Sequence, residues 1–317
     1  MGILVFVLQR LLTLFWVLIG ASILIFLILR FLPGDPVMAM IGADAPMEQI
    51  EQMRRDLGLD RGVAIQYLDW IWGVAQGDLG TSLVIRRPVF DLILARFPVT
   101  LHIAASSLVV ALLIALPAGV FAAVHKGRFI DHFCRVIALI GVSMPNFWLG
   151  LLFIAFFAVA LGILPPGGYV SPRQDLGLSL LHIIGPALAL GAYYAATITR
   201  MLRASMLDVL GRDYVLVARS LGIPERTVLW RDSLTNAFIP TLTVTGFAFG
   251  YMLAGVILVE VIFNIPGTGR LLYESILNRD YPMVQGIVLF NVALFVLINF
   301  FIDMLYVYFD PRLRSAS

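Results

Sequence analysis

The sequence predicts an all-α membrane protein with about six transmembrane helices. Of its 317 residues, 60% are hydrophobic and 13% are charged, whereas soluble domains contain about 25% charged residues. Its longest apolar stretches reach or exceed the roughly 20 residues that a helix needs to cross a bilayer, and they are much longer than a barrel strand. Because a helix satisfies its own backbone hydrogen bonds in lipid, the spans are expected to be helices.

Six apolar stretches are the expected spans. In chain order they are approximately Leu11 to Leu32, Leu101 to Val124, Val136 to Leu164, Leu180 to Ile198, Phe238 to Ile265 and Val284 to Tyr308. An even number of crossings places both termini on one side of the membrane. No small-residue cleavage site follows the first stretch, so we expect it to remain in the mature protein as an anchor.

The orientation follows from the arginines and lysines in the short connections and at the chain ends. Most of them lie on the side that carries both termini, and the opposite side carries Arg173, Arg270 and Arg279. The basic side is expected to be cytoplasmic, so both termini are expected there too. The segment 33–100 would then lie outside, because long translocated segments escape the charge rule.

Parts of this external segment are expected to be ordered. Asp44 is expected to cap a short helix that has Pro46 in its first turn and ends toward Gly58. Residues 66–74 are rich in aromatic side chains, and Gly77 to Gly80 is expected to form a turn. We interpret the aromatic residues as anchors at the membrane interface, with a contact for substrate delivery as the alternative.

Several kinds of chemistry have no residues to support them. The single lysine, Lys126, is followed by Gly127 instead of Ser or Thr, so the chain has no P-loop for a nucleotide. The four histidines lack the spacing of a zinc motif, and the one cysteine, Cys134, excludes an internal disulfide. The net charge is only +2, and the arginines are spread between the hydrophobic segments instead of forming one basic face. Both observations argue against nucleic acid as a partner. No catalytic, metal or cofactor site is expected in this chain.

Polar residues inside the spans are the remaining candidates for a pathway. A charged residue costs at least about 3 kcal/mol to insert. Glu260 and Asp303 qualify, although solvation at the membrane interface would explain both. Asn146, Asn291 and Asn299 lie deeper but cannot titrate. Of these residues, Asn146, Glu260 and Asn291 are our candidates for a pathway or gate.

The polar stretch 200–236 follows the fourth span. Its apolar residues recur at helical spacing, and Gly222 is expected to end this helix as its C-terminal cap. Pro224 and Glu225 would open a second, short helix that ends near Asp232. The stretch is therefore predicted to be a helix-turn-helix with charged and apolar surfaces. Its composition alone is equally compatible with a connector that lies among lipid headgroups.

Motifs along nearly the whole chain resemble those of bacterial ATP-binding-cassette importer permeases, in particular the first-permease branch of the dipeptide and oligopeptide family. They are Asp213 to Val215, Ala218 to Gly222, Leu32 to Pro36, Gly77 to Ser82, Ser143 to Trp148, Leu164 to Tyr169, Glu260 to Phe263, Pro266 to Gly269, Arg279 to Pro282 and Asp310 to Arg312. The general loop pattern of such permeases is degenerate here, since Leu216, Val217 and Thr235 replace an acidic residue, an alanine and a proline. Ala218 and Gly222 are retained.

The resemblance implies the type I importer permease fold and one half of a translocation pathway. The partners that it implies are a second similar permease, two cytoplasmic subunits that bind ATP and Mg²⁺, an external solute-binding protein and membrane lipid. It implies that an ATPase contacts Ala218, Gly222, Ile223, Pro224, Glu225 and Arg226. The expected organisation is a first helix 1–32, an external segment 33–100, a five-helix core 101–309 that includes the coupling segment 200–236, and a cytoplasmic tail 310–317. The membrane would be the cytoplasmic membrane of a bacterium or archaeon.

The expected cargo is a dipeptide or oligopeptide, although the same family includes importers of nickel, glutathione, opines and sugars. Two alternatives come from other classes of protein. One is an ion-coupled carrier that works alone. The other is a membrane-embedded hydrolase, for which His102 and Ser106 lie one helical turn apart. Co-isolation with ATPase subunits would favour the permease, and transport by the lone chain under an ion gradient would favour the carrier.

Overall fold

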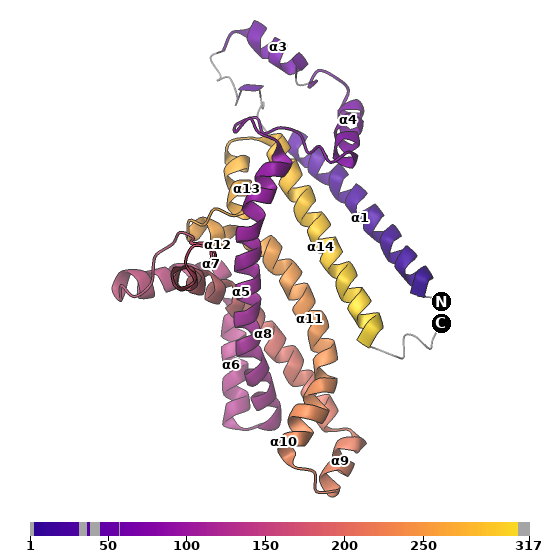
Figure 1. Ribbon diagram of the computed structural model, residues 1–317, viewed down its shortest axis with the longest axis vertical. Coiled ribbons are helices and arrows are strands. Elements are labelled where there is room, and N and C mark those ends of the chain that lie inside the picture. Colours follow the sequence, from indigo (N-terminus) through magenta and orange to yellow (C-terminus); the bar gives the residue numbers. More distant parts are fainter. Residues whose placement is uncertain (1–2, 32–36, 39–44, 57, 310–317) are drawn as a thin grey trace. The chain divides into compact units, whose positions relative to one another are not determined.

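The computed structural model describes residues 3–31, 37–38, 45–56 and 58–309 (Figure 1). Apart from one β-bridge between Thr81 and Pro88, these residues form helices and connecting turns. The helices are α1 (Ile3–Phe31), α3 (Met47–Asp56), α4 (Val63–Ala75), α5 (Val89–Val124), α6 (Phe129–Ser143), α7 (Asn146–Phe153), η1 (Ile154–Ala160), α8 (Leu176–Leu210), α9 (Asp213–Ser220), α10 (Glu225–Thr227), η2 (Val228–Ser233), α11 (Leu234–Gly255), α12 (Ile257–Ile262), α13 (Thr268–Leu277) and α14 (Tyr281–Phe309).

Some sequence predictions fall outside the described residues. These are the motif Leu32 to Pro36, the proposed helix cap Asp44, the motif that begins at Asp310 and the tail 310–317. The helix expected after Asp44 is present as α3, and Gly58 follows it with a positive φ of 65°.

The chain divides into two compact units. The first comprises Met1–Thr100 and Pro266–Leu297, and the second comprises Leu101–Ile265 and Ile298–Ser317. The coupling segment lies entirely in the second unit. Each unit is described separately below.

Within the described residues, five helices are long and apolar enough to cross a membrane. They are Val7–Phe31, Val89–Val124, Leu176–Leu210, Glu225–Gly255 and Tyr281–Met304. Each overlaps one of the expected spans, in agreement with the predicted all-α membrane fold. The second begins twelve residues before the expected Leu101, inside the segment 33–100, because Val89 and Ile93 are buried in the first unit.

The third expected span, Val136 to Leu164, is not one straight helix. Helix α6 and the α7–η1 helix meet at an angle of 99°. The break falls at Met144 and Pro145, which have extended backbones with ψ angles of 129° and 136°. Proline has no N–H to donate and disfavours the helical conformation in the residue before it, so the bend is placed by Pro145.

The predicted helix-turn-helix also needs two corrections. The helix expected to run up to Gly222 is divided: its first part continues α8, the chain turns at Gly211, and α9 begins at Asp213. Glycine is a poor helix former and an aspartate favours a helix N-terminus, so a new helix starts here. The short helix expected to end near Asp232 is not separate. No glycine or proline follows Glu225 until Pro240, and α10, η2 and α11 form one helical run to Gly255.

The second unit is built around α8, which packs against α6, α7 and α11. Small residues permit close approach. A Cβ atom added to Gly191 would lie 2.7 Å from the carbonyl oxygen of Ser107. Ser107 itself is buried and donates a hydrogen bond to the carbonyl of Ile103. This is the packing that small and hydroxyl residues provide between membrane helices.

Motifs that lie far apart in the sequence meet within each unit. In the first unit, the Ser82 hydroxyl and the backbone N–H of Leu83 donate to the buried carboxylate of Asp280, in the turn before α14. In the second unit, the Gly168 N–H donates to the carbonyl oxygen of Phe263, with a nitrogen–oxygen distance of 2.7 Å. A Cβ atom at Gly167 would lie 2.3 Å from the same oxygen. These motifs therefore hold loops against helix ends.

The aromatic residues of α4 divide between two environments. Tyr67 packs edge-on against Phe26 of α1 and Trp70 stacks on the same ring, with ring centroids 5.4 and 5.8 Å from that of Phe26. The Tyr67 hydroxyl also lies 2.9 Å from the hydroxyl of Ser22. Trp72, by contrast, is 68% exposed. Anchoring at an interface is thus compatible with Trp72, whereas Tyr67 and Trp70 fix α4 to α1.

Candidate functional site

The coupling segment begins on a firmly packed base. Leu202, Met206 and Val209, one turn apart along α8, are buried in a cluster with Val120 and Ala123 of α5. A Cβ atom at Gly119 would approach the Leu202 side chain to 3.0 Å. Because apolar residues at this spacing lie on one helix face, the last two turns of α8 are held in the second unit.

Helix α9 is fixed to the start of α11 on one side. Val215 of α9 is fully buried. The Asn236 side-chain amide donates a hydrogen bond to the Tyr214 hydroxyl, with a nitrogen–oxygen distance of 3.2 Å. The same amide also donates to the backbone carbonyl of Asp232, at a distance of 2.6 Å. Figure 1 shows α9 and α10 together beyond the ends of α8 and α11. The two helices of the segment therefore project as one hairpin.

The turn between them is a Schellman motif centred on Gly222. The N–H of Gly222 donates to the carbonyl of Arg219, and the N–H of Ile223 donates to the carbonyl of Ala218. Gly222 has a φ of 74°, the left-handed conformation that this motif requires. Ala218 and Ile223 occupy the two positions whose side chains usually meet across such a turn. The retained Ala218 and Gly222 thus have a structural explanation.

An exposed ion pair bridges the turn. The Arg219 guanidinium donates two hydrogen bonds to the carboxylate of Glu225, at 2.6 and 3.1 Å. Glu225 is the first residue of α10, after Pro224 as the N-cap. Hydrogen bonding to Glu225 raises the pKa of Arg219. The sequence suggested only that Glu225 favours a helix N-terminus, and the partner Arg219 was missed.

The predicted contact residues form one continuous surface. Gly222, Ile223, Pro224, Glu225 and Arg226 are exposed and Ala218 is half-buried. Apolar side chains beside them are also exposed, with Leu221 75% and Val217 56% accessible. A Cβ atom at Gly222 would meet no atom within 4 Å. The turn is therefore open, apolar at its tip and free to contact another protein.

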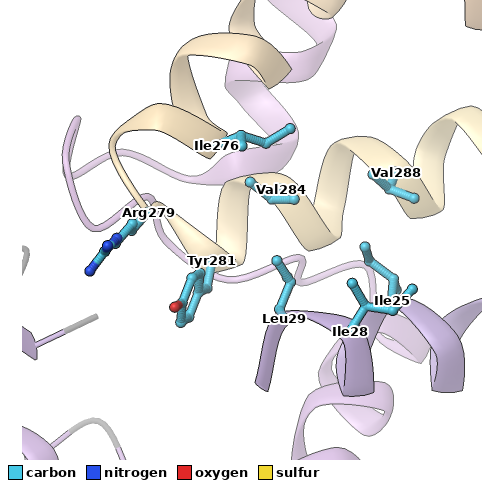
Figure 2. A pocket seen from close by; sticks show the side chains of 8 residues that line it. All are labelled: Ile25, Ile28, Leu29, Ile276, Arg279, Tyr281, Val284 and Val288. Atoms are coloured by element: carbon cyan, nitrogen blue, oxygen red, sulfur yellow. The ribbon is translucent and has the colours of Figure 1, made fainter. Parts of the chain in front are cut away.

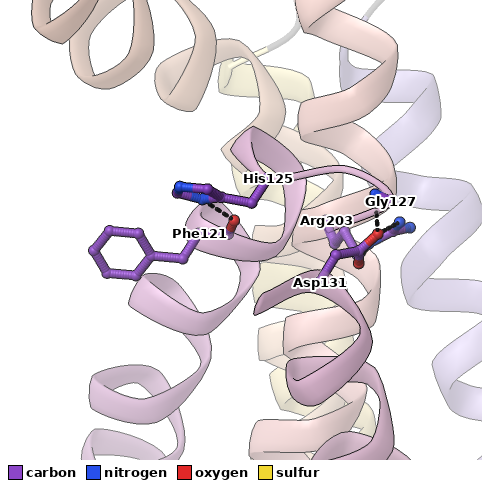
Figure 3. A network of polar contacts seen from close by, with 5 residues as sticks. All are labelled: Phe121, His125, Gly127, Asp131 and Arg203. Carbon is purple, nitrogen blue, oxygen red and sulfur yellow. Dashed lines mark hydrogen bonds and ion pairs between the residues drawn. The ribbon is translucent and has the colours of Figure 1, made fainter. Parts of the chain in front are cut away.

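A second arginine–carboxylate pair lies at the turn between α5 and α6 (Figure 3). Asp131 is 1% exposed and accepts two hydrogen bonds of 2.7 Å from Arg203 of α8. It also accepts a 2.9 Å hydrogen bond from the backbone N–H of Gly127. Sequence analysis missed this pair, although Asp131 in the first turn of a helix is a recognisable signal. Its partner, 72 positions later, has no sequence signal.

The candidate pathway residues have different environments. Asn146 is the first residue of α7 and half-buried, and it lies in the second unit with Glu260. Asn291 is half-buried on α14, in the first unit. Glu260 is fully buried in α12, so solvation at an interface, the simpler explanation of this residue, is wrong. The role of these three residues in a pathway or gate stays a prediction.

The hydrolase alternative was based on His102 and Ser106, and the His102 ring packs edge-on against Tyr169. His102 Nδ1 lies 3.2 Å from the Tyr169 hydroxyl. The described residues contain no group of three or more His, Cys, Asp or Glu side chains that could hold a metal ion.

Comparisons with known proteins agree with this architecture. Residues 3–104 match the family described as "Binding-prot-dependent transport system membrane comp, N-term". The glutathione transport system permease protein GsiC of Escherichia coli O6:H1 is 43% identical over 309 residues, which cover 98% of each chain. The protein of the same name from Shigella dysenteriae serotype 1 is 42% identical over the same lengths.

A solved structure supports the fold. The MetNI methionine ABC transporter, in inward-facing conformations, matches with a TM-score of 0.56 and 19% identity, over 68% of this chain and 94% of that chain. Residues 115–315 match the family "Binding-protein-dependent transport system inner membrane component". The chain belongs to this family and is a multi-pass inner-membrane permease subunit of an ABC importer, a transport component rather than an enzyme.

Proposed function

We propose that this chain forms half of the translocation pathway of an ATP-driven importer of short peptides, with glutathione as the first candidate cargo. The motif resemblance favours peptides, and the relatives named above are glutathione permeases. The two expectations are compatible because glutathione is a tripeptide. In this proposal a second permease, two ATPases and an external binding protein are separate subunits, since the sequence has no P-loop.

The Gly222 turn is the proposed contact for an ATPase. The observation that carries this proposal is the continuous helical run from the exposed Glu225 to Gly255, which includes a candidate span. Closure of the ATPase pair would displace the turn, and the helix would transmit this displacement into the membrane as a rigid element. Residues of the turn transmit force and carry out no reaction.

Cargo and energy source are tested together in proteoliposomes that contain the complex isolated with a tagged copy of this chain. We expect uptake of labelled glutathione to require ATP inside and the binding protein outside. Unlabelled dipeptides and nickel serve as competitors. ATP-dependent uptake of nickel alone would refute the peptide cargo, and uptake by the lone chain under an ion gradient would refute the permease assignment.

The docking surface is tested with Leu221→Asp, and Leu221→Met is the matched control that keeps an apolar side chain. Leu221 is 75% exposed, so neither change should affect folding. We expect Leu221→Asp to reduce the amount of co-isolated ATPase about tenfold, because losing a central apolar contact costs more than about 1 kcal/mol. Equal recovery of ATPase with both variants would contradict docking at this turn.

A further inference from the structure

An apolar groove in the first unit lies between α1 and α14 and has a volume of about 280 Å³ (Figure 2). Aliphatic side chains form its walls: Ile25, Ile28 and Leu29 of α1, Val284 and Val288 of α14, and Ile276 of α13. Ile28 is 54% exposed and Ile276 is 50% exposed, so the groove is open to its surroundings. Both long helices are candidate membrane spans, and these surroundings are therefore lipid.

One end of the groove is polar and basic. Figure 2 shows Arg279 and Tyr281 together at this end, with the Arg279 guanidinium directed away from the aliphatic walls. Arg30 follows the lining residue Leu29 in the last turn of α1, and its guanidinium lies over the Phe26 ring, 4.6 Å from the ring centroid. The adjacent carboxylate of Asp280 is occupied by the hydrogen bonds from Ser82 and Leu83. With Arg279 and Arg30 against the single carboxylate of Asp280, this end has a net positive charge.

The backbone at Arg279 indicates that its side chain matters. The N–H groups of Arg279 and Asp280 donate to the carbonyls of Ile276 and Ser275, which closes α13 with a Schellman motif. Arg279 has a φ of 55°, at the position where glycine or asparagine is usual. An arginine in this left-handed conformation introduces backbone strain. The sequence thus places a guanidinium where the backbone alone would favour glycine.

We propose that this groove binds one acyl chain of an anionic phospholipid whose phosphate contacts Arg279 and Arg30. On the predicted orientation the lipid belongs to the outer leaflet. Aliphatic walls match a hydrocarbon chain, and a guanidinium forms two parallel hydrogen bonds with a phosphate. A peptide in the groove would leave its backbone polar groups without partners, which is unfavourable. The basic end of the groove matches a phosphate headgroup, and its aliphatic walls match an acyl chain, as in a phospholipid.

The experiment uses the complex isolated with the tagged chain, in nanodiscs that contain equal amounts of phosphatidylglycerol and phosphatidylcholine. The lipids that remain bound after transfer to detergent are measured by mass spectrometry. We expect the wild type to be enriched in phosphatidylglycerol. Arg279→Gly should reduce this enrichment about fivefold, which corresponds to the about 1 kcal/mol that one arginine contributes near an anionic lipid surface.

Two controls separate lipid binding from structural damage. Glycine fits the backbone at position 279, so Arg279→Gly should leave the melting temperature unchanged or raised, and Arg279→Lys should restore part of the enrichment. Arg87→Gln, a change at another exposed arginine of the first unit, should have no effect. Equal enrichment in the wild type and in Arg279→Gly would overturn the proposal.

The occupant is identified with a phosphatidylglycerol that carries a photoactivatable diazirine in its acyl chain. We expect labelled peptides that contain Ile28 and Val288, and loss of this labelling in Val288→Trp, in which the indole fills the groove. Val288→Trp should keep the same yield of complex as the wild type, which excludes a folding defect. Cross-links from these peptides to a second permease would show that a protein covers the groove. Labelling that is absent from these peptides in the wild type would show that no acyl chain enters it, and either result would overturn the proposal.

Discussion

The turns at Gly127 and Gly222 each contain a glycine at positive φ, with φ angles of 76° and 74°. Their backbone hydrogen bonds differ, because the N–H of Arg128 donates to the carbonyl of His125, whereas the N–H of Ile223 donates to the carbonyl of Ala218. Each stands next to one arginine–carboxylate pair, and neither glycine has an atom within 4 Å of an added Cβ. The pairs differ in burial. The side chains of Asp131 and Arg203 are 1% and 21% exposed, whereas those of Glu225 and Arg219 are 53% and 39% exposed.

This difference separates two turns that both have a glycine at positive φ beside an arginine–carboxylate pair. A buried pair loses its hydration, so removal of one partner leaves an uncompensated charge inside the protein. An exposed pair exchanges its partner for water at little cost. The turn at Gly127 is therefore tied to α8, while the turn at Gly222 keeps its charges and apolar tip accessible for another subunit.

The largest expected effect comes from Asp131→Asn. The Arg203 charge would lose its carboxylate partner, and the expected loss of stability is about 3 kcal/mol. The measurement is the melting temperature of the purified complex and the yield of chain in the membrane. Glu225→Gln is the matched control at the exposed pair, and an equal loss in both variants would contradict the comparison.

The next effect comes from Gly222→Val. A β-branched residue is strained at positive φ by at least about 1–2 kcal/mol, so the turn should open while the remainder of the unit stays folded. We expect ATP-dependent uptake to fall at least about tenfold with normal membrane insertion, which corresponds to about 1.4 kcal/mol. Gly222→Asn, which tolerates this conformation, should keep most activity. Full uptake with Gly222→Val would show that the turn does not couple the subunits.

Gly127→Val introduces the same strain beside the buried pair. We expect it to lower the melting temperature, because Asp131 accepts a hydrogen bond from the Gly127 N–H. Uptake per folded complex should stay close to that of the wild type. If instead both glycine variants lose uptake without a change in melting temperature, both turns are contacts for partner subunits.

The smallest effect is expected from Glu225→Gln. Exposed ion pairs contribute about 0.2–1 kcal/mol, so the melting temperature should hardly change. The recovery of ATPase should fall by about twofold at low salt and be unchanged at high salt, because salt screens exposed charges. A double variant with Arg219→Gln tests whether the two residues act as a pair, since additive effects would exclude coupling.

The sequence predicted the elements whose signals are local. Long apolar stretches predicted six spans, and five of them are single long helices among the described residues. Gly222 with Pro224 predicted the turn of the coupling segment. The errors arose where a local signal was weak. Gly211 was not recognised as a helix end, and the absence of glycine and proline after Glu225 was not recognised as a sign of one continuous helix.

Several residues could not be assigned from the sequence. Arg203 is one of several arginines in the polar stretch 200–236, and nothing in its sequence neighbourhood marks it as the partner of the buried Asp131. Glu260 was a candidate for a pathway or gate, with solvation at the interface as the simpler explanation, and the sequence did not show that it is fully buried. Burial and pairing depend on residues that are distant in the chain, and spacing carries no information about them.

The sequence by itself determined that this chain is a helical membrane protein without a nucleotide loop, because apolar length and missing residue types are properties of the chain alone. The tertiary structure decided which charges are buried and which are exposed. It also placed Arg279 at the end of an apolar groove and joined the exposed turn to a membrane helix. These features depend on which helix faces pack together, and packing is fixed only when the whole unit folds.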